Sequence, residues 1–242
     1  MTGRSVSGIM KAIILAAGEG RRLRPLTENM PKCLVPVNGK PLLEYWLENC
    51  EKNGIGEVLI NGYYLVDQVQ YYLNKIEKKF SMKINFAVEE ELSGTGGFLK
   101  NNREFVGDEG FFFFCHGDNF TNIDIAEFIA FHRSKNTFLS VALFKTNLPK
   151  QCGIADEIDD DGKILRFIEK PDRPKSNLAS AAIFLMSPTI IDRFPNKPVI
   201  DFSKEVLPKF QGEMYGFPMK GFNIDIGTPE NYRQANEIAT QL

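Results

Sequence analysis

The sequence predicts an α/β fold in which a mostly parallel sheet lies between layers of helices and joins a smaller α+β lobe. In the first half, short apolar strands alternate with amphipathic helices over short loops, the pattern of a helix-covered parallel sheet. In the second half, strands follow one another with fewer helices between them. No linker rich in Gly, Ser or Pro separates the halves of the 242-residue chain. We therefore expect one domain with two lobes and a cleft where they meet.

The first half supplies the predicted parallel strands and the helices between them. Apolar segments of strand length are residues 12–17, 57–60, 83–88 and 111–115. The last, FFFFC, is typical of a strand that is covered on both faces. Pro41 opens a helix that Gly54 ends, and its apolar residues are spaced i, i+3, i+4, i+7. Further amphipathic helices are expected from Leu65 to Ile76 and around Ile125.

The second half carries strands near residues 138–144, 164–168, 179–186 and 213–217. The acidic run that begins at Asp159 and the following Gly162 predict a hairpin turn. Gly94–Gly97 is expected to be a loop or the start of a helix. Residues 1–10 lack the layout of a signal peptide, so we expect a mobile extension there and a single domain over residues 11–242.

Charge and hydropathy exclude two classes of partner. The chain has 29 Lys and Arg against 31 Asp and Glu, a net charge of −2, and nucleic-acid binders are usually basic. The longest apolar run, Ala12 to Ala17, is six residues, whereas a membrane span needs about 20. We therefore expect no nucleic acid and no membrane as partner.

The cysteines predict no metal centre. Cys33, Cys50, Cys115 and Cys152 are widely spaced and form no C-x-x-C pair. Scattered thiols of this kind indicate a reducing cytoplasm.

A glycine-rich basic loop from Leu15 to Thr27 is the most informative segment. Gly18 and Gly20 follow a strand and let successive backbone N–H groups face an anion. Five basic and two acidic residues from Gly18 to Lys40 give a local charge of +3, which suits a polyphosphate. No P-loop string occurs, and the third glycine of a dinucleotide fingerprint is missing. By composition alone, a solvated basic loop is an equal alternative.

The whole stretch resembles a known family. Leu15–Tyr45 reads LAAGEGRRLRPLTENMPKCLVPVNGKPLLEY. It is similar to the signature of the nucleotidylyltransferases that make sugar nucleotides, the NDP-sugar pyrophosphorylases, and further matches run from Lys11 to about Tyr232. The resemblance implies a Rossmann-like three-layer sandwich with a mostly parallel mixed sheet. It also implies a nucleotide lobe at about 11–135, a sugar-binding α+β lobe at about 136–220 and a final metal-binding and helical segment at 221–242.

The resemblance assigns roles to the nucleotide lobe. Arg22 and Lys32 match the catalytic cations that grip the triphosphate. A glycine loop binds the nucleotide, and a second loop, E-L-S-G-T-G-G, recognises the base. The nucleotide-binding residues so implied are Leu15, Ala16, Ala17, Gly18, Glu19, Gly20, Glu91, Gly94, Thr95 and Gly96.

Two aspartates match the metal ligands of the family. Asp118 follows the phenylalanine-rich strand, where a carboxylate is well placed for Mg²⁺. Asp225 lies in F-N-I-D-I-G-T-P, which resembles a W-x-D-I-G-T-P string. Asp118 taken alone would more often cap a turn. The resemblance therefore predicts Mg²⁺ as the cofactor.

The sugar-binding residues implied are Asn119, Gly153, Glu169, Lys170 and Ser180. One departure concerns the family's N-x-G, where this chain has Ser180 and Ala182. The departure puts the identity of the sugar in doubt.

Neither histidine is expected to be catalytic. His132 falls on the apolar side of its helix and predicts a packed side chain. His116 adjoins Asp118, but we expect its side chain on the opposite face of the strand.

Together these features predict a Mg²⁺-dependent transferase that converts an NTP and a sugar 1-phosphate into an NDP-sugar and pyrophosphate. GTP with a mannose- or heptose-type 1-phosphate is the leading expectation. Thymidylyl, uridylyl or cytidylyl transfer, with another sugar 1-phosphate or phosphocholine, stays open. A catalytically inactive regulatory subunit is an alternative of another class. The oligomeric state is open, with a homodimer as one option.

Overall fold

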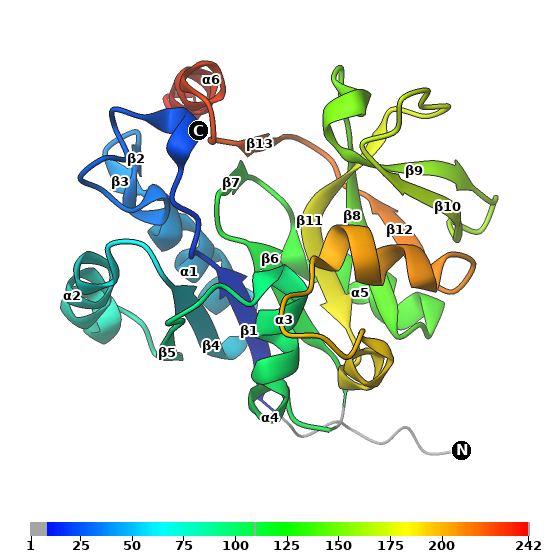
Figure 1. Cartoon of the computed structure of the whole chain (residues 1–242), viewed down its shortest axis with the longest axis horizontal. Helices are drawn as coiled ribbons and strands as arrows, with labels where there is room; N and C mark the ends of the chain where they lie inside the picture. The colour runs from blue at the N-terminus through cyan, green and yellow to red at the C-terminus, as the bar shows by residue number, and fades with distance from the viewer. Residues whose placement is uncertain (1–8, 109, 242) are drawn as a thin grey trace.

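The computed structural model describes residues 9–108 and 110–241, and a nine-stranded mixed sheet forms the centre of these residues (Figure 1). The strands of this sheet are β1 (Met10–Leu15), β4 (Ile55–Gly62), β5 (Lys83–Val88), β6 (Phe112–His116), β8 (Leu139–Lys145), β9 (Gly153–Ile158), β10 (Ile164–Glu169), β11 (Leu178–Met186) and β12 (Tyr215–Pro218). Two small ribbons pair β2 (Pro36–Val37) with β3 (Lys40–Pro41) and β7 (Asn119–Thr121) with β13 (Asn223–Asp225). The helices are α1 (Leu42–Lys52), α2 (Val66–Ile76), α3 (Gly94–Asn101), α4 (Arg103–Val106), α5 (Ile125–Lys135) and α6 (Pro229–Ala239).

The parallel half of the sheet is the half that carries helices between its strands. Its order is β6–β1–β4–β5, with every neighbouring pair parallel. Beyond β6 the sheet turns antiparallel through β11, which also pairs with β8 and β9. The predicted hairpin turn at Asp159–Gly162 joins the antiparallel strands β9 and β10. This mixed, mostly parallel sheet confirms the predicted fold class.

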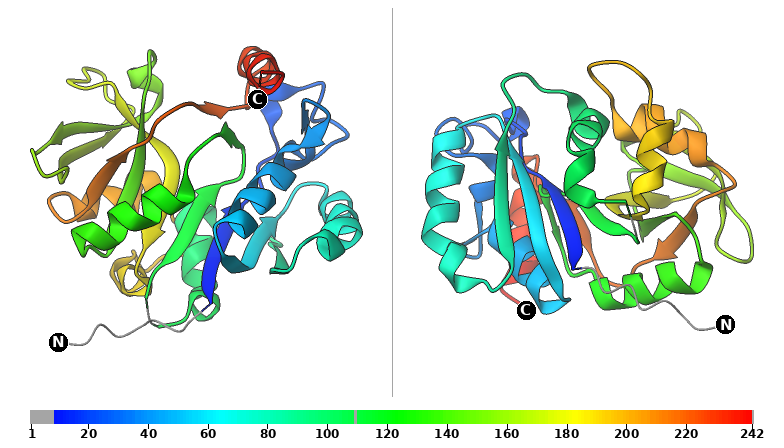
Figure 2. Two further views of the ribbon diagram at one scale, coloured as in Figure 1. Left: turned by 180° about the vertical axis from the view of Figure 1, so that it is seen from behind. Right: turned by 90° about the horizontal axis from the view of Figure 1, so that it is seen from below.

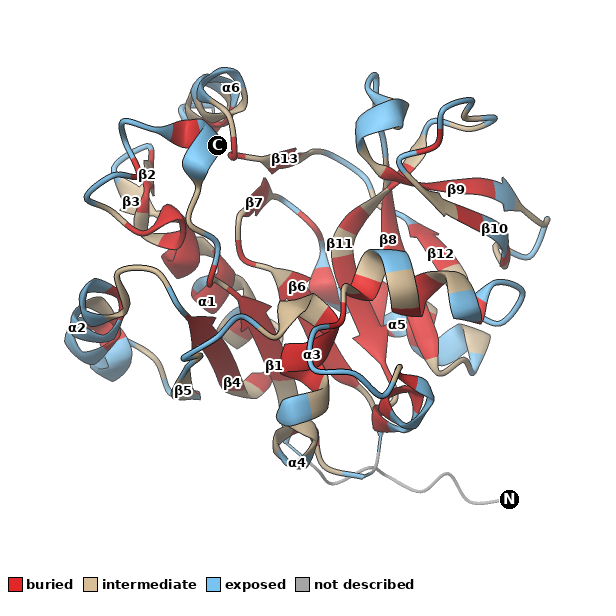
Figure 3. Cartoon of the chain, viewed as in Figure 1, coloured by how far each residue is buried: buried red, intermediate tan, exposed pale blue. Residues whose placement is uncertain are grey.

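Each face of the sheet has its own hydrophobic core. Ala12 and Ile14 of β1 pack into one core with α1, α2 and α5, while Ile13 packs into the other with α3 and α4. The alternation follows from the two-residue repeat of a strand. The result is a three-layer sandwich whose buried residues concentrate in the sheet and on the inner sides of the helices (Figures 2 and 3). A third, smaller core joins α6 to the two ribbons.

Several boundaries differ from the expectation. β1 begins at Met10, so the expected extension overlaps the sheet by that residue, and residues 1–8 lie outside the described residues. Pro41 ends β3, and α1 starts one residue later. β9 was not expected because Asp156 interrupts its apolar character; Asp156 is buried and lies 3.6 Å from Arg166.

No helix within residues 9–108 and 110–241 has the length and hydropathy that a bilayer crossing requires.

His132 is packed, as predicted, and makes the stability of the fold pH-dependent. The residue is 3% exposed, and its Nδ1 lies 2.8 Å from Ser140 Oγ. Burial, helped by Arg133, lowers the pKa of His132 to about 4. Because the unfolded chain binds this proton near pH 6.5, the stabilisation is complete above pH 6.5 and is lost as pH falls toward 4. The loss amounts to at most about 3 kcal/mol.

We expect His132→Gln to remove this part of the pH dependence. Urea unfolding of wild type and variant at several pH values from 7.5 to 4 gives the difference in their free energies of unfolding. That difference should shift in the variant's favour as the pH falls. Parallel curves over this range would contradict a buried neutral imidazole.

Candidate active site

Four charged side chains from distant parts of the chain meet beyond the carboxyl end of β6. Lys32 Nζ lies 2.7 Å from Asp118 Oδ2 and 2.7 Å from Asp225 Oδ1. Arg22 Nη2 lies 3.3 Å from Asp225 Oδ2. The two predicted metal ligands and the two predicted cations therefore form one cluster.

The β7–β13 ribbon brings the two aspartates together. Asp225 pairs with Asn119 in this ribbon, and Asn119 directly follows Asp118. The Ile226 N–H also donates to the Asp118 carbonyl oxygen at 3.2 Å. Asp118 itself lies in the turn after β6, the edge of a parallel sheet where ligands commonly bind.

Two short 3-10 turns carry the cations, Arg22 on Arg21–Leu23 and Lys32 on Lys32–Leu34. Gly20 precedes the first turn with φ +66°, a left-handed conformation that favours glycine. A Cβ at Gly227 would lie 2.8 Å from Arg22 Nη2 and 3.0 Å from Lys32 Nζ. The glycine two residues after Asp225 thus leaves room for both cations.

The electrostatics of the cluster distinguish its two cations. Burial lowers the pKa of Lys32, but Asp118 and Asp225 outweigh it and hold the pKa above its usual value. Burial raises the pKa of Asp118, but Lys32 and His116 outweigh it, so the carboxyl stays ionised well below pH 7. The Lys32 side chain is 7% exposed and that of Arg22 is 68% exposed. Lys32 is therefore a fixed part of the site, whereas Arg22 faces solvent and can reach a ligand.

The donor set of the acid pair fits Mg²⁺. The side chains of Asp118 and Asp225 are 37% and 44% exposed, so both keep carboxylate surface open beside Lys32. Within the described part of the chain, no group of three or more His, Cys, Asp or Glu side chains could hold a metal. Two carboxylates suit Mg²⁺ because it retains waters and takes further ligands from phosphates.

A pocket of about 240 Å³ adjoins the acid pair on the predicted nucleotide side. The predicted binding residues Leu15, Ala17, Gly18, Gly94, Thr95 and Asp118 line it. Other predicted residues of these loops have different roles. Ala16 N–H donates to Asn61 Oδ1, Glu19 pairs with Arg21, and Gly96 N–H donates to the Ile200 carbonyl oxygen.

The wall of this pocket contains a polar network that the motifs did not predict. Asn61, at the carboxyl end of β4, donates from Nδ2 to Glu89 Oε2 at 2.7 Å. Glu89 Oε1 accepts from Ser93 N and Oγ at 3.1 and 2.6 Å. Glu91, the predicted residue, is exposed, and it is Glu89 that lines the pocket. The sequence does carry a signal for Asn61, because this polar residue directly follows the apolar strand segment 57–60.

The expectation that the His116 side chain lies on the face opposite Asp118 was wrong. Its side chain lines the same pocket as Asp118. Nε2 is buried and has no hydrogen-bond partner among the described residues. Burial lowers the pKa of His116, although Asp118 and Asp225 act in the opposite direction, so the ring is neutral near pH 7. The turn after β6 brings Asp118 back toward this side.

Three predicted sugar-binding residues lie together at the paired ends of β9 and β10. Glu169 pairs with Gly153, and Lys170 N–H donates to the Cys152 carbonyl oxygen at 2.9 Å. A Cβ at Gly153 would lie 2.6 Å from Glu169 Oε2, so glycine lets this carboxylate lie across the strand. Burial raises the pKa of Glu169, and Lys170 only partly opposes it.

Cys152, next to Gly153, has a thiol whose pKa is raised. Burial raises the pKa of its thiol, a hydrogen bond with Thr146 opposes the rise, and the Glu169 and Asp225 carboxylates add to it. Strand β11 links the predicted sugar residues and the acid pair: Ala179 pairs with Ile154, next to Gly153, and the Ala181 carbonyl oxygen accepts from Asn119, the neighbour of Asp118.

A bulge in β11 carries the residues that depart from the family pattern. Its register with β8 shifts between Ser180 and Phe184, and Ala182 has φ +55°. This left-handed conformation explains why a glycine suits the position. Ser180 Oγ accepts from Ala182 N–H at 3.1 Å, and Asn119 Nδ2 donates to the Ala181 carbonyl oxygen at 3.3 Å.

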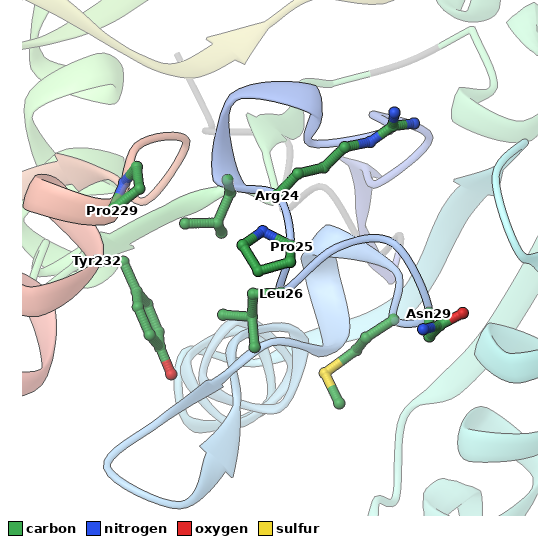
Figure 4. Close-up of a pocket in the computed structure, with 8 residues that line it drawn as sticks. Arg24, Pro25, Leu26, Asn29, Pro229 and Tyr232 are labelled. Carbon is green, nitrogen blue, oxygen red and sulfur yellow. The ribbon is translucent and has the colours of Figure 1, made fainter.

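A cavity of about 550 Å³ has neither of these carboxylates in its lining, which Figure 4 shows. Its wall is mainly apolar and includes Pro25, Leu26, Met30 and Tyr232, with Arg24 as its one charged residue. It therefore lacks the grouped charges needed for phosphate chemistry.

Comparisons with known proteins agree with this geometry. The sequence profile of the family described as "Nucleotidyl transferase" matches residues 11–241. Mannose-1-phosphate guanylyltransferase catalytic subunit beta of Dictyostelium discoideum is 32% identical over 225 residues, 92% of this chain and 62% of the relative. Probable mannose-1-phosphate guanylyltransferase 1 of Oryza sativa subsp. japonica is 34% identical over 227 residues, 92% of this chain and 63% of the relative. The chain thus spans less than two thirds of these relatives.

Solved structures share the fold over nearly the whole chain. HddC from Yersinia pseudotuberculosis aligns with a TM-score of 0.80 at 29% identity, covering 95% of this chain and 99% of its own. It has also been solved in complex with GMP-PN, with a TM-score of 0.79. A putative glucose-1-phosphate thymidylyltransferase from Bacillus anthracis aligns with a TM-score of 0.84 at 26% identity, covering 96% of each chain.

Proposed function

Since the chain belongs to the nucleotidyl transferase family, we propose that it transfers a nucleotidyl group from an NTP to a sugar 1-phosphate and releases pyrophosphate. The observation that carries the proposal is the cluster of Asp118, Asp225, Lys32 and Arg22 beside a pocket. An inactive subunit would have no use for these charges, because grouping them costs folding free energy.

The reaction needs positioning and charge neutralisation more than covalent catalysis. An oxygen of the sugar phosphate attacks the α-phosphorus, a new P–O bond forms, and the bond to the leaving pyrophosphate breaks. Charge spread over the phosphoryl oxygens is stabilised by preorganised cations. Arg22 can contact two phosphate oxygens at once, and Lys32 supplies a compact charge from its position between Asp118 and Asp225.

Asp118 and Asp225 would hold Mg²⁺ in this proposal. The ion would neutralise phosphate charge and help to orient the triphosphate. Lys32 holds the pKa of the Asp118 carboxyl below its usual value and so favours the ionised form, which is the form that can bind a divalent cation. Removing divalent ions should therefore stop turnover.

Glu89 supports GTP as the nucleotide. Its carboxylate lines the pocket, and bonds from Asn61 and Ser93 fix its orientation. The Watson–Crick edge of guanine presents two adjacent N–H donors, and Glu89 Oε2, which accepts from Asn61, has a second lone pair that can accept one of them. Adenine, cytosine, uracil and thymine do not present two adjacent donors on this edge. The names of the guanylyltransferase relatives point the same way.

For the acceptor, we propose a mannose- or heptose-type sugar 1-phosphate bound by Gly153, Glu169 and Lys170. Lys170 would orient the attacking phosphate and Glu169 the sugar hydroxyls. Phosphocholine is less well supported, since a quaternary amine calls for an aromatic cage. The buried free thiols Cys33, Cys50 and Cys115 support a reducing location such as the cytoplasm.

A pyrophosphate-release screen tests the proposal. GTP, ATP, CTP, UTP and dTTP are each combined with Mg²⁺ and a panel of sugar 1-phosphates and phosphocholine. Release that requires both GTP and mannose 1-phosphate or a heptose 1-phosphate supports the proposed pair. Release with another pair keeps the reaction class and corrects the substrates. No release from any pair would contradict the function.

The base assignment gives a sharper prediction. Glu89→Gln should lower kcat/KM for GTP by about 10- to 100-fold, because an amide N–H then faces the guanine donors. The exposed neighbour Glu90→Gln is the matched control. Equal kcat/KM for GTP in both variants would remove Glu89 from base recognition.

A further inference from the structure

Asn223 has a buried carbonyl oxygen with no hydrogen-bond partner among the described residues. Asn223 lies on β13 two residues before Asp225, so both side chains point to the same side of this strand. It also occupies the position that the W-x-D spacing gives to tryptophan, so the pattern itself does not explain a polar residue here.

The orientation of the amide follows from its neighbour. Asn223 Nδ2 donates to the Ala181 carbonyl oxygen at 3.4 Å. That oxygen can only accept, so the nitrogen must face it and Oδ1 must face elsewhere. Rotating the amide would place two acceptors against each other.

The surroundings of Asn223 belong to the predicted sugar side of the site. Ala181 lies in the β11 bulge between Ser180 and Ala182, and Asn119 donates to the same carbonyl oxygen. The residues that line the nucleotide pocket do not include Asn223. A buried unpaired acceptor destabilises the free protein, so its presence here calls for an explanation in function or in a bound group.

We propose that Asn223 Oδ1 accepts a hydrogen bond from a ring hydroxyl of the sugar 1-phosphate and thereby helps to select the acceptor. A neutral carbonyl oxygen suits an O–H donor and repels phosphate oxygens, so the partner is the sugar ring and not its phosphate. The inference rests on the proposed function and adds a specificity residue to it.

The experiment measures kcat and KM for Asn223→Ala with GTP, mannose 1-phosphate and its monodeoxy analogues. We expect kcat/KM for the parent sugar phosphate to fall about 10- to 100-fold, while KM for GTP stays unchanged. With wild type, one monodeoxy analogue should have a kcat/KM that is lower than that of the parent sugar phosphate by a similar factor. With the variant, the same analogue should have a kcat/KM close to that of the parent sugar phosphate. This coupling separates a contact with the hydroxyl from a structural effect.

Asn122→Ala is the matched control. Asn122 Oδ1 accepts from Phe222 N–H at 2.9 Å, so this variant removes a hydrogen bond next to β13. It leaves the unpaired Asn223 Oδ1 in place. It should leave the preference among the sugar analogues unchanged. Asn223→Leu, which fills a similar volume without an acceptor, is the second variant if the alanine variant unfolds.

The outcomes separate the two proposals. Suppose that wild type turns over GTP with mannose 1-phosphate, but that each monodeoxy analogue lowers kcat/KM by the same factor in wild type and in the variants. The role of Asn223 is then overturned, and the proposed function stands. If wild type turns over well with all monodeoxy analogues, the role is overturned without reference to any variant. If wild type turns over no sugar 1-phosphate with any NTP, both proposals fall.

Discussion

Asp118→Asn is expected to lower kcat for pyrophosphate release by roughly 10³-fold or more while the protein stays folded. The substitution keeps the size of the side chain but removes a charge that lies 2.7 Å from Lys32. Lys32 retains Asp225 as a partner, so no unpaired cation is left in the interior. What is lost is half of the carboxylate pair proposed to bind Mg²⁺.

The measurement is initial-rate pyrophosphate release over a range of Mg²⁺ concentrations, with circular dichroism to check folding. Asp124→Asn is the matched control. Asp124 caps α5 by accepting from Glu127 N–H, and asparagine caps about as well as aspartate. Near-normal turnover of a folded Asp118→Asn protein would remove Asp118 from the metal site.

Arg22→Ala is expected to lower kcat by about 10²-fold or more with almost no change in stability. The side chain is 68% exposed and its ion pair with Asp225 is a surface pair, which contributes at most about 1 kcal/mol. Any large effect on rate must then come from contact with substrate. Lys32 offers no such clean test because it is buried within the fold.

Steady-state kinetics with varied GTP, together with thermal unfolding, check this prediction. Arg24→Ala, two residues along the same loop, removes an equal charge from an exposed residue at the apolar cavity. We expect that control to behave like wild type. A higher KM for GTP with unchanged kcat in Arg22→Ala would make Arg22 a binding residue without a special role in the transition state.

Local pattern was sufficient for the parallel half of the fold. The apolar strands 12–17 and 111–115 and the helix around Ile125 correspond to β1, β6 and α5. The antiparallel half was harder, because β9 buries Asp156 against a partner from β10 that the local sequence does not reveal. The ribbon of β7 and β13 joins segments about a hundred residues apart, and neither is long enough to show periodicity.

The site divides in the same way. Arg22, Lys32, Asp118 and Asp225 belong to strings long enough to recognise, and the structure brings all four together. Single polar residues that lie outside such strings cannot be recognised in the same way. Glu89 was missed in favour of Glu91 because which carboxylate faces the pocket depends on the bonds that Asn61 and Ser93 make.

His116 was assigned to the wrong face of its strand, and Asn223 was not singled out, for a related reason. Each has a buried polar atom without a partner among the described residues, a property of three-dimensional packing that no spacing rule encodes.

A crystal structure with a non-hydrolysable GTP analogue and Mn²⁺ in place of Mg²⁺ tests the central claim most directly, because anomalous scattering locates the metal. We predict a metal peak bound by both Asp118 and Asp225, with the triphosphate in contact with Arg22 and Lys32. A nucleotide bound with its metal on other residues, or with its phosphates away from these two cations, would contradict the account.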